Sequence, residues 1–204
     1  MALKDAIKFE CKSLIGRIFS KKVRNPKDSL IHIGCGDNII KDFENIDFYH
    51  VRFWKARHIQ HDLRYALPYE DGVFEGAFSE HTLEHLYLKD GRFLLKEIYR
   101  VLREKSVFRC VVPDLSLYVN NYMGNPPNKE FERYDSGCDA FNSLAHNWGH
   151  LTIWDESTLK KEISKAGFDE VKICKFGEGT NPNLIQDLLS RRWESIYVEG
   201  LKKS

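Results

Sequence analysis

Short apolar runs alternate with longer amphipathic segments along most of this chain. Runs rich in β-branched and aromatic residues, bounded by turn residues, predict β-strands. Because most of these strands are separated by segments long enough for a crossover, the pattern predicts an α/β fold with a mainly parallel sheet. The last two runs are joined by a turn-rich link, which indicates an antiparallel edge. The predicted strands are 30–33, 44–48, 57–61, 73–79, 107–112, 170–176 and 193–201.

Three segments have helical periodicity. One long helix is expected over 83–103, and a second over 156–166, begun by Asp155 and closed by Gly167. Segment 1–24 places apolar residues at helical spacing opposite a face rich in lysine and arginine. We expect the buried face of the long helix to contain Leu86, Phe93, Leu94, Ile98, Val101 and Leu102.

The chain divides into an N-terminal helix, 1–24, and one domain, 25–204. The favoured interpretation of the helix is docking on the domain with its basic face in solvent. Contact with an anionic membrane surface and a lid over the site are the alternatives. Segment 115–151 is rich in Asn, Pro, Gly and aromatic residues. It is expected to be a long irregular insertion that forms a lid or lines the substrate side.

A glycine turn follows the first strand, in the run Leu30-Ile31-His32-Ile33-Gly34-Cys35-Gly36. Glycine lacks Cβ, so the backbone can adopt positive φ and a ligand can approach it closely. A turn of this kind at the carboxyl end of a strand is how open α/β sheets build ligand sites. Short glycine patterns are weak evidence alone, so whether this turn is a ligand site depends on the other segments of the chain.

Composition narrows the classes of function. Net charge is +1, which gives no electrostatic case for nucleic acid binding. No apolar run approaches the roughly 18–20 residues that span a bilayer, and charged residues interrupt the N-terminus where a signal peptide would be apolar. Five scattered cysteines without C-x-x-C spacing indicate free thiols. We therefore expect a cytoplasmic protein, peripheral to the membrane only if segment 1–24 binds it.

Several motifs, in order, resemble the class I S-adenosylmethionine-dependent methyltransferases. The resemblance covers about 29–203 and is strongest to small predicted methyltransferases of bacterial surface-polysaccharide gene clusters. It implies a Rossmann-like doubly wound sheet of seven strands. The matching stretches are Leu30 to Gly36, Asn45-Ile46-Asp47, His61 to Arg64 with Leu67-Pro68, Ser79 to Leu86, Glu97 to Leu102, Val112 to Leu115, Ala166-Gly167-Phe168 and Tyr197-Val198-Glu199.

The resemblance implies a role for each residue at the carboxyl edge of the sheet. Asp47 would accept hydrogen bonds from the ribose hydroxyls of the methyl donor, as carboxylates at this position do in dinucleotide sites. Asp62 would accept from the adenine amino group, with Leu63 against the ring. The methionyl portion would lie near the glycine turn and the end of the fourth strand. The cofactor-binding set is His32, Gly34, Cys35, Gly36, Asp47, Asp62, Leu63, Ser79 and Glu80.

Two features depart from the family pattern. His32 stands where an acidic or amide residue is usual, and Asp37-Asn38 replace the third glycine. They leave open a donor-binding module with lost or regulatory activity. A methyltransferase acting on protein or nucleic acid is a further alternative, although no Asn/Asp-Pro-Pro-Tyr-type tetrad is present.

Methyl transfer to a hydroxyl benefits from a base, and histidine is suited to that task. The candidate bases are His81, His150 and Asp114, and His146 is a further candidate. The spacings His81/His85 and His146/His150 would suit zinc on a helix, but no H-E-x-x-H motif occurs, so no metal is expected. The predicted reaction is methylation of a hydroxyl on a small molecule or saccharide precursor.

Overall fold

The computed structural model describes residues 10, 11, 13, 14, 24–48 and 58–203. Its centre is a seven-stranded sheet with the order β3-β2-β1-β4-β5-β7-β6. The strands are β1 (Leu30–Ile33), β2 (Phe43–Asp47), β3 (His58–Gln60), β4 (Phe74–Glu80), β5 (Leu102–Pro113), β6 (Glu170–Cys174) and β7 (Ser195–Lys202).

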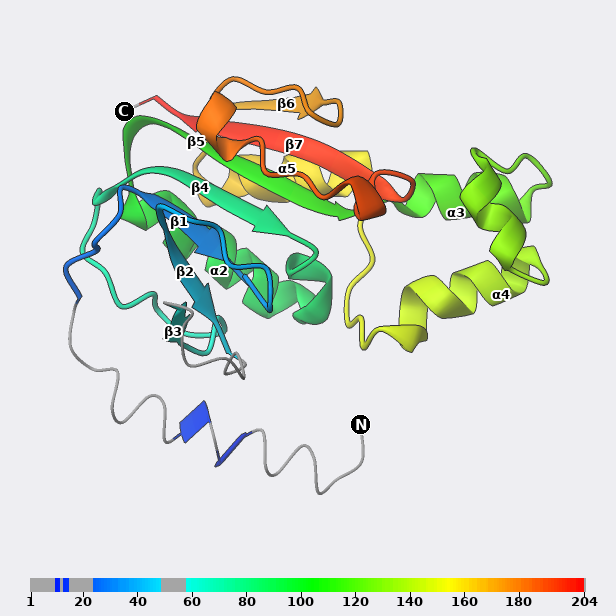
Figure 1. The fold of residues 1–204 in the computed structure, drawn as a ribbon, viewed down its shortest axis with the longest axis horizontal. Helices are drawn as coiled ribbons and strands as arrows, with labels where there is room; N and C mark the ends of the chain where they lie inside the picture. Colours follow the sequence, from blue (N-terminus) through cyan, green and yellow to red (C-terminus); the bar gives the residue numbers. More distant parts are fainter. Residues whose placement is uncertain (1–9, 12, 15–23, 49–57, 204) are drawn as a thin grey trace.

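The predicted sheet is confirmed. The pairs β3/β2, β2/β1, β1/β4 and β4/β5 are parallel, whereas β7 runs antiparallel to both β5 and β6. The reversed strand is therefore one position in from the edge strand β6 (Figure 1). Because β1 and β4 are adjacent, with β2 on one side and β5 on the other, the chain changes direction at β1 and places a ligand crevice at their carboxyl ends.

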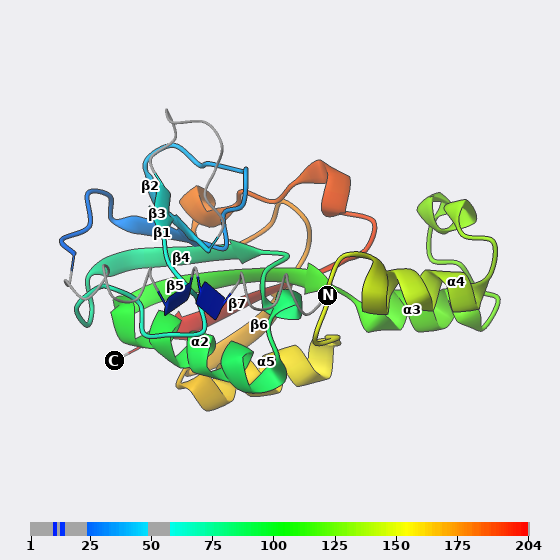
Figure 2. The ribbon, with the colours of Figure 1, turned by 90° about the horizontal axis from the view of Figure 1, so that it is seen from below.

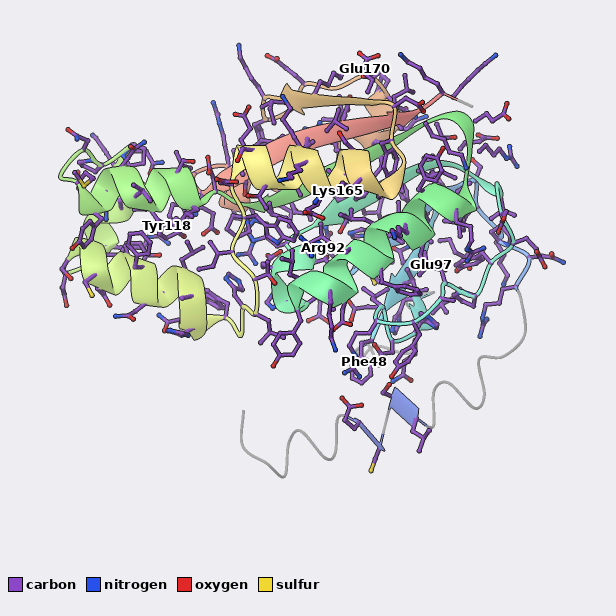
Figure 3. The ribbon with its side chains drawn as sticks, turned by 180° about the vertical axis from the view of Figure 1, so that it is seen from behind. Phe48, Arg92, Glu97, Tyr118, Lys165 and Glu170 are labelled. Atoms are coloured by element: carbon purple, nitrogen blue, oxygen red, sulfur yellow. The ribbon has the colours of Figure 1, made fainter. Side chains whose placement is uncertain are left out.

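Two helices cover one face of this sheet, α2 (Leu88–Val101) and α5 (Glu156–Ala166) (Figure 2). Leu94 and Ile98 of α2 pack with Ile163 of α5 against Ile31 and Ile33 of β1 in the main core. Between the helices, the buried Glu162 carboxylate accepts hydrogen bonds from Arg92 and Lys165, which Figure 3 shows on facing sides. The predicted helix over 156–166 is confirmed, and Asp155 accepts from Thr158 N at 2.7 Å as its cap.

The opposite face is covered by segment 175–192, which contains the short helices η4 (Pro182–Leu184) and η5 (Leu189–Arg191). Leu184 packs there with Phe78 and Tyr197 in a second core cluster. Arg109 of β5 is fully buried and ties the segment down. Its guanidinium donates to Asp187 at 2.7 and 2.5 Å, and to the carbonyl of Glu178 at 2.9 Å.

The expected continuous helix over 83–103 is wrong. A 3-10 turn, η1 (Leu83–His85), precedes α2, and Leu102 already begins β5. The carbonyl of Glu84 accepts from Leu151 N at 2.7 Å and Thr152 N at 3.1 Å. These tertiary bonds engage a carbonyl that a continuous helix would use for its own i+4 donor. Phe93, assigned to the buried face, is 40% exposed.

The prediction that segment 115–151 is irregular is also wrong, because much of the segment is helical. It contains α3 (Leu115–Tyr122), η2 (Lys129–Arg133), α4 (Gly137–Asn142) and a π-helical turn, η3 (Ser143–Asn147). Asp114, Asn128 and Ser136 accept from backbone N–H groups as N-caps. The polar residues that suggested a loop cap short helices instead. Tyr118, labelled in Figure 3, forms a small core with Phe131 and Tyr134.

Most of the predicted N-terminal helix lies outside the described residues. Glu10, Cys11, Ser13 and Leu14 are helical. Ser13 Oγ donates to the Asp62 carboxylate, and Glu10 lies 2.7 Å from Arg64. The five cysteines all fall within the described part and are free thiols, as predicted. No helix in the described ranges is long and apolar enough to cross a membrane.

Candidate cofactor and acceptor site

The glycine turn is fixed to the carboxyl end of β2. Gly34 N and Cys35 N donate to the carbonyl of Ile46 at 2.8 and 3.3 Å, and Gly36 N donates to Asp47 Oδ2 at 2.9 Å. Gly34 has φ +73° and Gly36 has φ +48°, both in the region that glycine occupies without strain. The sequence-predicted partners Gly34, Gly36 and Asp47 are therefore brought together.

The two glycines serve different purposes. A Cβ on Gly34 would lie 2.1 Å from Thr82 Oγ1, so this glycine lets the segment after β4 pack on the turn. A Cβ on Gly36 would meet no atom within 4 Å. The open space is therefore above Gly36, beside the Asp47 carboxylate. A ligand fitting the turn would contact the backbone there.

His32 and Cys35 are buried beside the turn. His32 Nδ1 lies 3.2 Å from Asn45 Oδ1, and its ring packs against Phe78 with centroids 5.2 Å apart. Burial lowers the pKa of His32 to about 4, so the imidazole is neutral. Burial, with the charge of Asp47, raises the pKa of the Cys35 thiol to about 12. Both groups are thus uncharged at neutral pH, and Asn45 satisfies the histidine that replaces the usual polar residue.

Asp62 and Leu63 lie in the predicted adenine-side segment, but both have protein partners. Arg64 donates to both carboxylate oxygens of Asp62, at 2.7–3.2 Å, and Ser13 donates to the same group. Burial opposes ionisation of Asp62, but these hydrogen bonds outweigh it and hold its pKa below the ordinary value. Leu63 is packed in the main core. Asp62 therefore anchors the N-terminal segment in this structure.

Ser79 and Glu80 end β4 and are buried. Glu80 Oε1 accepts a hydrogen bond from Leu188 N at 3.0 Å, so this carboxylate holds segment 175–192 against β4. Burial raises the pKa of Glu80 to about 7.

His81 is held in an unusual backbone conformation, with φ +50°. Its Nε2 lies 2.8 Å from Ser195 Oγ, and that hydroxyl donates to the carbonyl of Arg191 at 2.7 Å. Because the serine donates its only proton to that carbonyl, it can only accept a hydrogen bond from His81. The imidazole proton is therefore on Nε2. His81 Nδ1 then faces Glu84 Oε1 at 3.4 Å. Burial lowers the pKa of His81 well below 6.5, with the charge of Arg191 adding to the shift.

A partly open cavity of about 80 Å³ adjoins this histidine. His81 and His150, both predicted as candidate bases, meet in it. His85, Trp148 and Arg191 also form its wall, and sequence reasoning did not assign them to the site. The full lining is His81, His85, Trp148, His150, Arg191 and Glu194.

Asp114 and His146 occupy different places. Asp114 Oδ1 accepts from Ser116 N at 2.8 Å and caps α3, and burial raises the pKa of the carboxyl, with Asp155 and Glu156 as its charged neighbours. His146 is exposed on the π-helical turn η3. Neither residue lines the cavity.

Sequence signals existed for some of the missed residues. Glu84-His85 lies inside a stretch already matched to the methyltransferases, and Trp148 lies in the aromatic segment. Arg191 and Glu194 carry no motif. They reach the cavity because Arg109 and Glu80 hold segment 175–192 over the sheet.

The strand order, the glycine turn and the acidic end of β2 define a Rossmann-like, methyltransferase-type architecture. Comparison with protein families agrees, since residues 41–110, about a third of the chain, match a methyltransferase domain model. A comparison with curated proteins finds no match.

Solved structures of low identity share the fold. A Thermotoga maritima S-adenosylmethionine-dependent methyltransferase, described as a possible histamine N-methyltransferase, is 16% identical with a TM-score of 0.57, over 98% of this chain and 97% of that one. An Archaeoglobus fulgidus S-adenosylmethionine-dependent methyltransferase is 16% identical with a TM-score of 0.55, over 93% and 92%. The Burkholderia thailandensis 1,6-didemethyltoxoflavin-N1-methyltransferase, solved with S-adenosylhomocysteine, is 13% identical with a TM-score of 0.53, over 96% and 78%.

The resemblance to class I S-adenosylmethionine-dependent methyltransferases is thus confirmed, in the fold and in the matched segment. The Thermotoga maritima and Archaeoglobus fulgidus structures are described as S-adenosylmethionine-dependent methyltransferases. The geometry fits S-adenosylmethionine at one point in particular, the open space over Gly36 beside Asp47.

Proposed function

We propose that this chain transfers a methyl group from S-adenosylmethionine to a hydroxyl of a small molecule or saccharide precursor. The observation that carries the proposal is the Gly36 N–Asp47 hydrogen bond at 2.9 Å, beside open space at the carboxyl edge of the sheet. Asp47 would hold the ribose hydroxyls, and the backbone at Gly34, Cys35 and Gly36 would hold the methionyl portion. When bound, S-adenosylmethionine supplies an electrophilic methyl group on a sulfonium.

The cavity lined by His81, His85 and His150 is the candidate acceptor site. Burial lowers the pKa of His85, an effect partly offset by its hydrogen bond with the Gly149 backbone and by the charge of Asp47. The strands β1 and β4 are adjacent and parallel, so the glycine turn after β1 and the segment after β4 that carries His81 and His85 lie at the same edge of the sheet. Trp148 is 67% exposed and offers a ring face for stacking on a sugar or aromatic acceptor.

Removal of the acceptor proton falls to the histidines of the cavity. Burial lowers the pKa of His150, and its Nδ1 is bonded to the carbonyl of Leu144 at 2.5 Å. The proton is therefore on Nδ1, and Nε2 is the basic nitrogen. His81 Nε2 is bonded to Ser195. His150 is accordingly the favoured base, and Asp114, which caps α3, is the least favoured of the three predicted candidates.

The alternatives are a donor-binding module without turnover, or a protein or nucleic acid acceptor. Satisfaction of His32 by Asn45 favours a working site over a degenerate one. Contact of segment 1–24 with a membrane stays a prediction, whereas the contacts of Glu10 and Ser13 with Arg64 and Asp62 support docking on the domain.

The test is calorimetric titration with S-adenosylmethionine and S-adenosylhomocysteine. We expect wild type to bind both and Asp47→Ala to bind at least about 10-fold more weakly, since two charge-assisted hydrogen bonds are lost. Asp37→Ala, an exposed carboxylate in the same turn, is the matched control and should bind like wild type. No binding by wild type at millimolar ligand would refute the proposal. If Asp47→Ala binds the ligands as tightly as Asp37→Ala and wild type do, only the role of Asp47 is refuted.

A further inference from the structure

Three potential metal ligands meet at the wall of the acceptor cavity. One ligand atom each from Glu84, His85 and His150 lies within 4.8 Å of the other two. Glu84 and His85 come from the turn η1, and His150 follows the π-helical turn η3. The fold therefore joins one histidine from each of the two H-x3-H spacings, a combination that neither spacing predicted.

Glu84 is the observation that points to a ligand. Its side chain is 1% exposed, and neither carboxylate oxygen accepts a hydrogen bond from the residues that the structure describes. His81 Nδ1 lies 3.4 Å from Oε1, but the imidazole proton is on Nε2, so Nδ1 has none to donate. Burying a polar group without a hydrogen-bond partner destabilises the folded state. Such groups are rare in folded proteins and are usually explained by a bound water, ion or functional role. A cation would satisfy both oxygens.

His150 is oriented as a metal-binding histidine is. Its Nδ1 lies 2.5 Å from the carbonyl of Leu144, and the His85 ring packs edge-on against its ring with centroids 5.0 Å apart. A metal-binding histidine characteristically donates its second N–H to a backbone carbonyl or carboxylate, which fixes the ring and frees the other nitrogen. The bond from Leu151 N to the Glu84 carbonyl, 2.7 Å long, holds the two halves of the cluster together.

We propose that Glu84, His85 and His150 form a binding site for a divalent transition-metal ion such as Zn²⁺. Two imidazoles and one carboxylate are a donor set of catalytic zinc sites and of other divalent sites with open positions. The adjoining cavity supplies space for a further ligand. The role of the ion in methyl transfer rests on the proposed function. The ion would bind the acceptor oxygen and lower the pKa of its hydroxyl, so that the proton can pass to water. His150 Nε2 would then be a metal ligand, and it would act as the base only when no ion is bound.

The positive charge of one side chain beside this site would repel a bound metal ion. Arg191 lines the same cavity, with its Nη1 3.5 Å from Glu194 Oε1, so its charge is partly balanced. Arg191→Gln should therefore bind Zn²⁺ more tightly than wild type. If the cavity is an anion site instead, Arg191→Gln will leave Zn²⁺ binding unchanged and abolish binding of inorganic phosphate, which would overturn the proposal.

The main experiment is a competition titration of Zn²⁺ between the chelator-stripped full chain and a chromophoric chelator, without methyl donor. Wild type should bind one ion per chain. Glu84→Gln, His85→Ala and His150→Ala should each lose more than the roughly 10–100-fold that follows removal of an outer-shell partner. Glu84→Gln keeps the side-chain shape and introduces no charge, so it should stay folded by circular dichroism.

Two controls separate this site from adventitious zinc binding. His146→Ala removes the exposed histidine of the same H-x3-H spacing, and Cys11→Ser/Cys138→Ser removes the two exposed thiols. Both should bind like wild type. No stoichiometric Zn²⁺ on wild type, unchanged binding by the ligand variants, or loss only in the thiol variant would overturn the site. Because donor titration is a separate assay, failure here leaves the methyltransferase proposal standing, and the reverse also holds.

Discussion

Substitution of Gly34 by alanine gives the sharpest test of how the cofactor turn is built. Gly34 has φ +73°, and a Cβ there would lie 2.1 Å from Thr82 Oγ1, 2.3 Å from its Cγ2 and 2.7 Å from its Cβ. Thr82 cannot swing away freely, because its Oγ1 lies 3.3 Å from the carbonyls of Ile33 and Glu80.

The cost has two parts. A left-handed backbone conformation costs an alanine about 1–2 kcal/mol, and overpacking against Thr82 adds about 1–3 kcal/mol. Gly34→Ala should therefore lower the free energy of unfolding by about 2–5 kcal/mol. In a chain of this length each kcal/mol shifts the Tm by about 2–4 °C, so the expected loss is roughly 4–20 °C.

Gly36→Ala is the matched control. Gly36 also has positive φ, +48°, but its Cβ would meet no atom within 4 Å. It should cost only the backbone part, about 1–2 kcal/mol. The difference between the two variants isolates the clash with Thr82.

Urea unfolding of both variants, alone and combined with Thr82→Gly, measures that clash. In the Thr82→Gly background the two alanine substitutions should cost the same, because the side chain that a Cβ at position 34 would strike is gone. If Gly34→Ala is no more costly than Gly36→Ala in wild type, or if the difference survives Thr82→Gly, the packing argument is refuted.

Two further predictions concern buried charge. Burial raises the pKa of Glu80 from 4.5 to about 7, so folding takes up a proton and stability falls as pH rises through that interval. Glu80→Gln should remove up to about 3 kcal/mol of this dependence, and urea unfolding at a series of pH values checks it; an unchanged slope contradicts it. Arg109→Met should cost about 3–5 kcal/mol by leaving Asp187 buried without its cation, whereas Glu199 keeps Lys172 at 3.5 Å. Arg103→Met, at an exposed pair, should cost less than about 1 kcal/mol, and equal costs in thermal unfolding would contradict the assignment.

The supporting packing around the site explains why its two halves differ. Gly34 and Gly36 follow β1, and Asp47 ends the adjacent parallel strand β2. They meet through the bonds of Gly34 N to the Ile46 carbonyl and of Gly36 N to the Asp47 carboxylate. Arg191 and Glu194 reach the cavity from the far end of the sheet, through a segment anchored by Arg109. The donor half is therefore a local consequence of the sheet, whereas the acceptor half depends on long-range side-chain pairing.

The sequence by itself determined the elements and their class. Apolar runs predicted all seven strands within a few residues, because burial in a sheet imposes a local pattern. The glycine turn and Asp47 followed as well, since carboxyl ends of parallel strands share one edge. Asp155 and Gly167 bounded α5 for reasons local to that helix. These features depend on contacts between neighbours in sequence or between adjacent strands.

Only the tertiary structure decided the rest. The predicted helix over 83–103 is broken because Leu151 and Thr152, far along the chain, take the carbonyl of Glu84. Segment 115–151 is helical because its polar residues cap short helices around a shared aromatic core. The cluster of Glu84, His85 and His150 combines residues from two helical turns some 65 positions apart. Such contacts leave no periodic signal, because spacing along a chain fixes proximity only within one element.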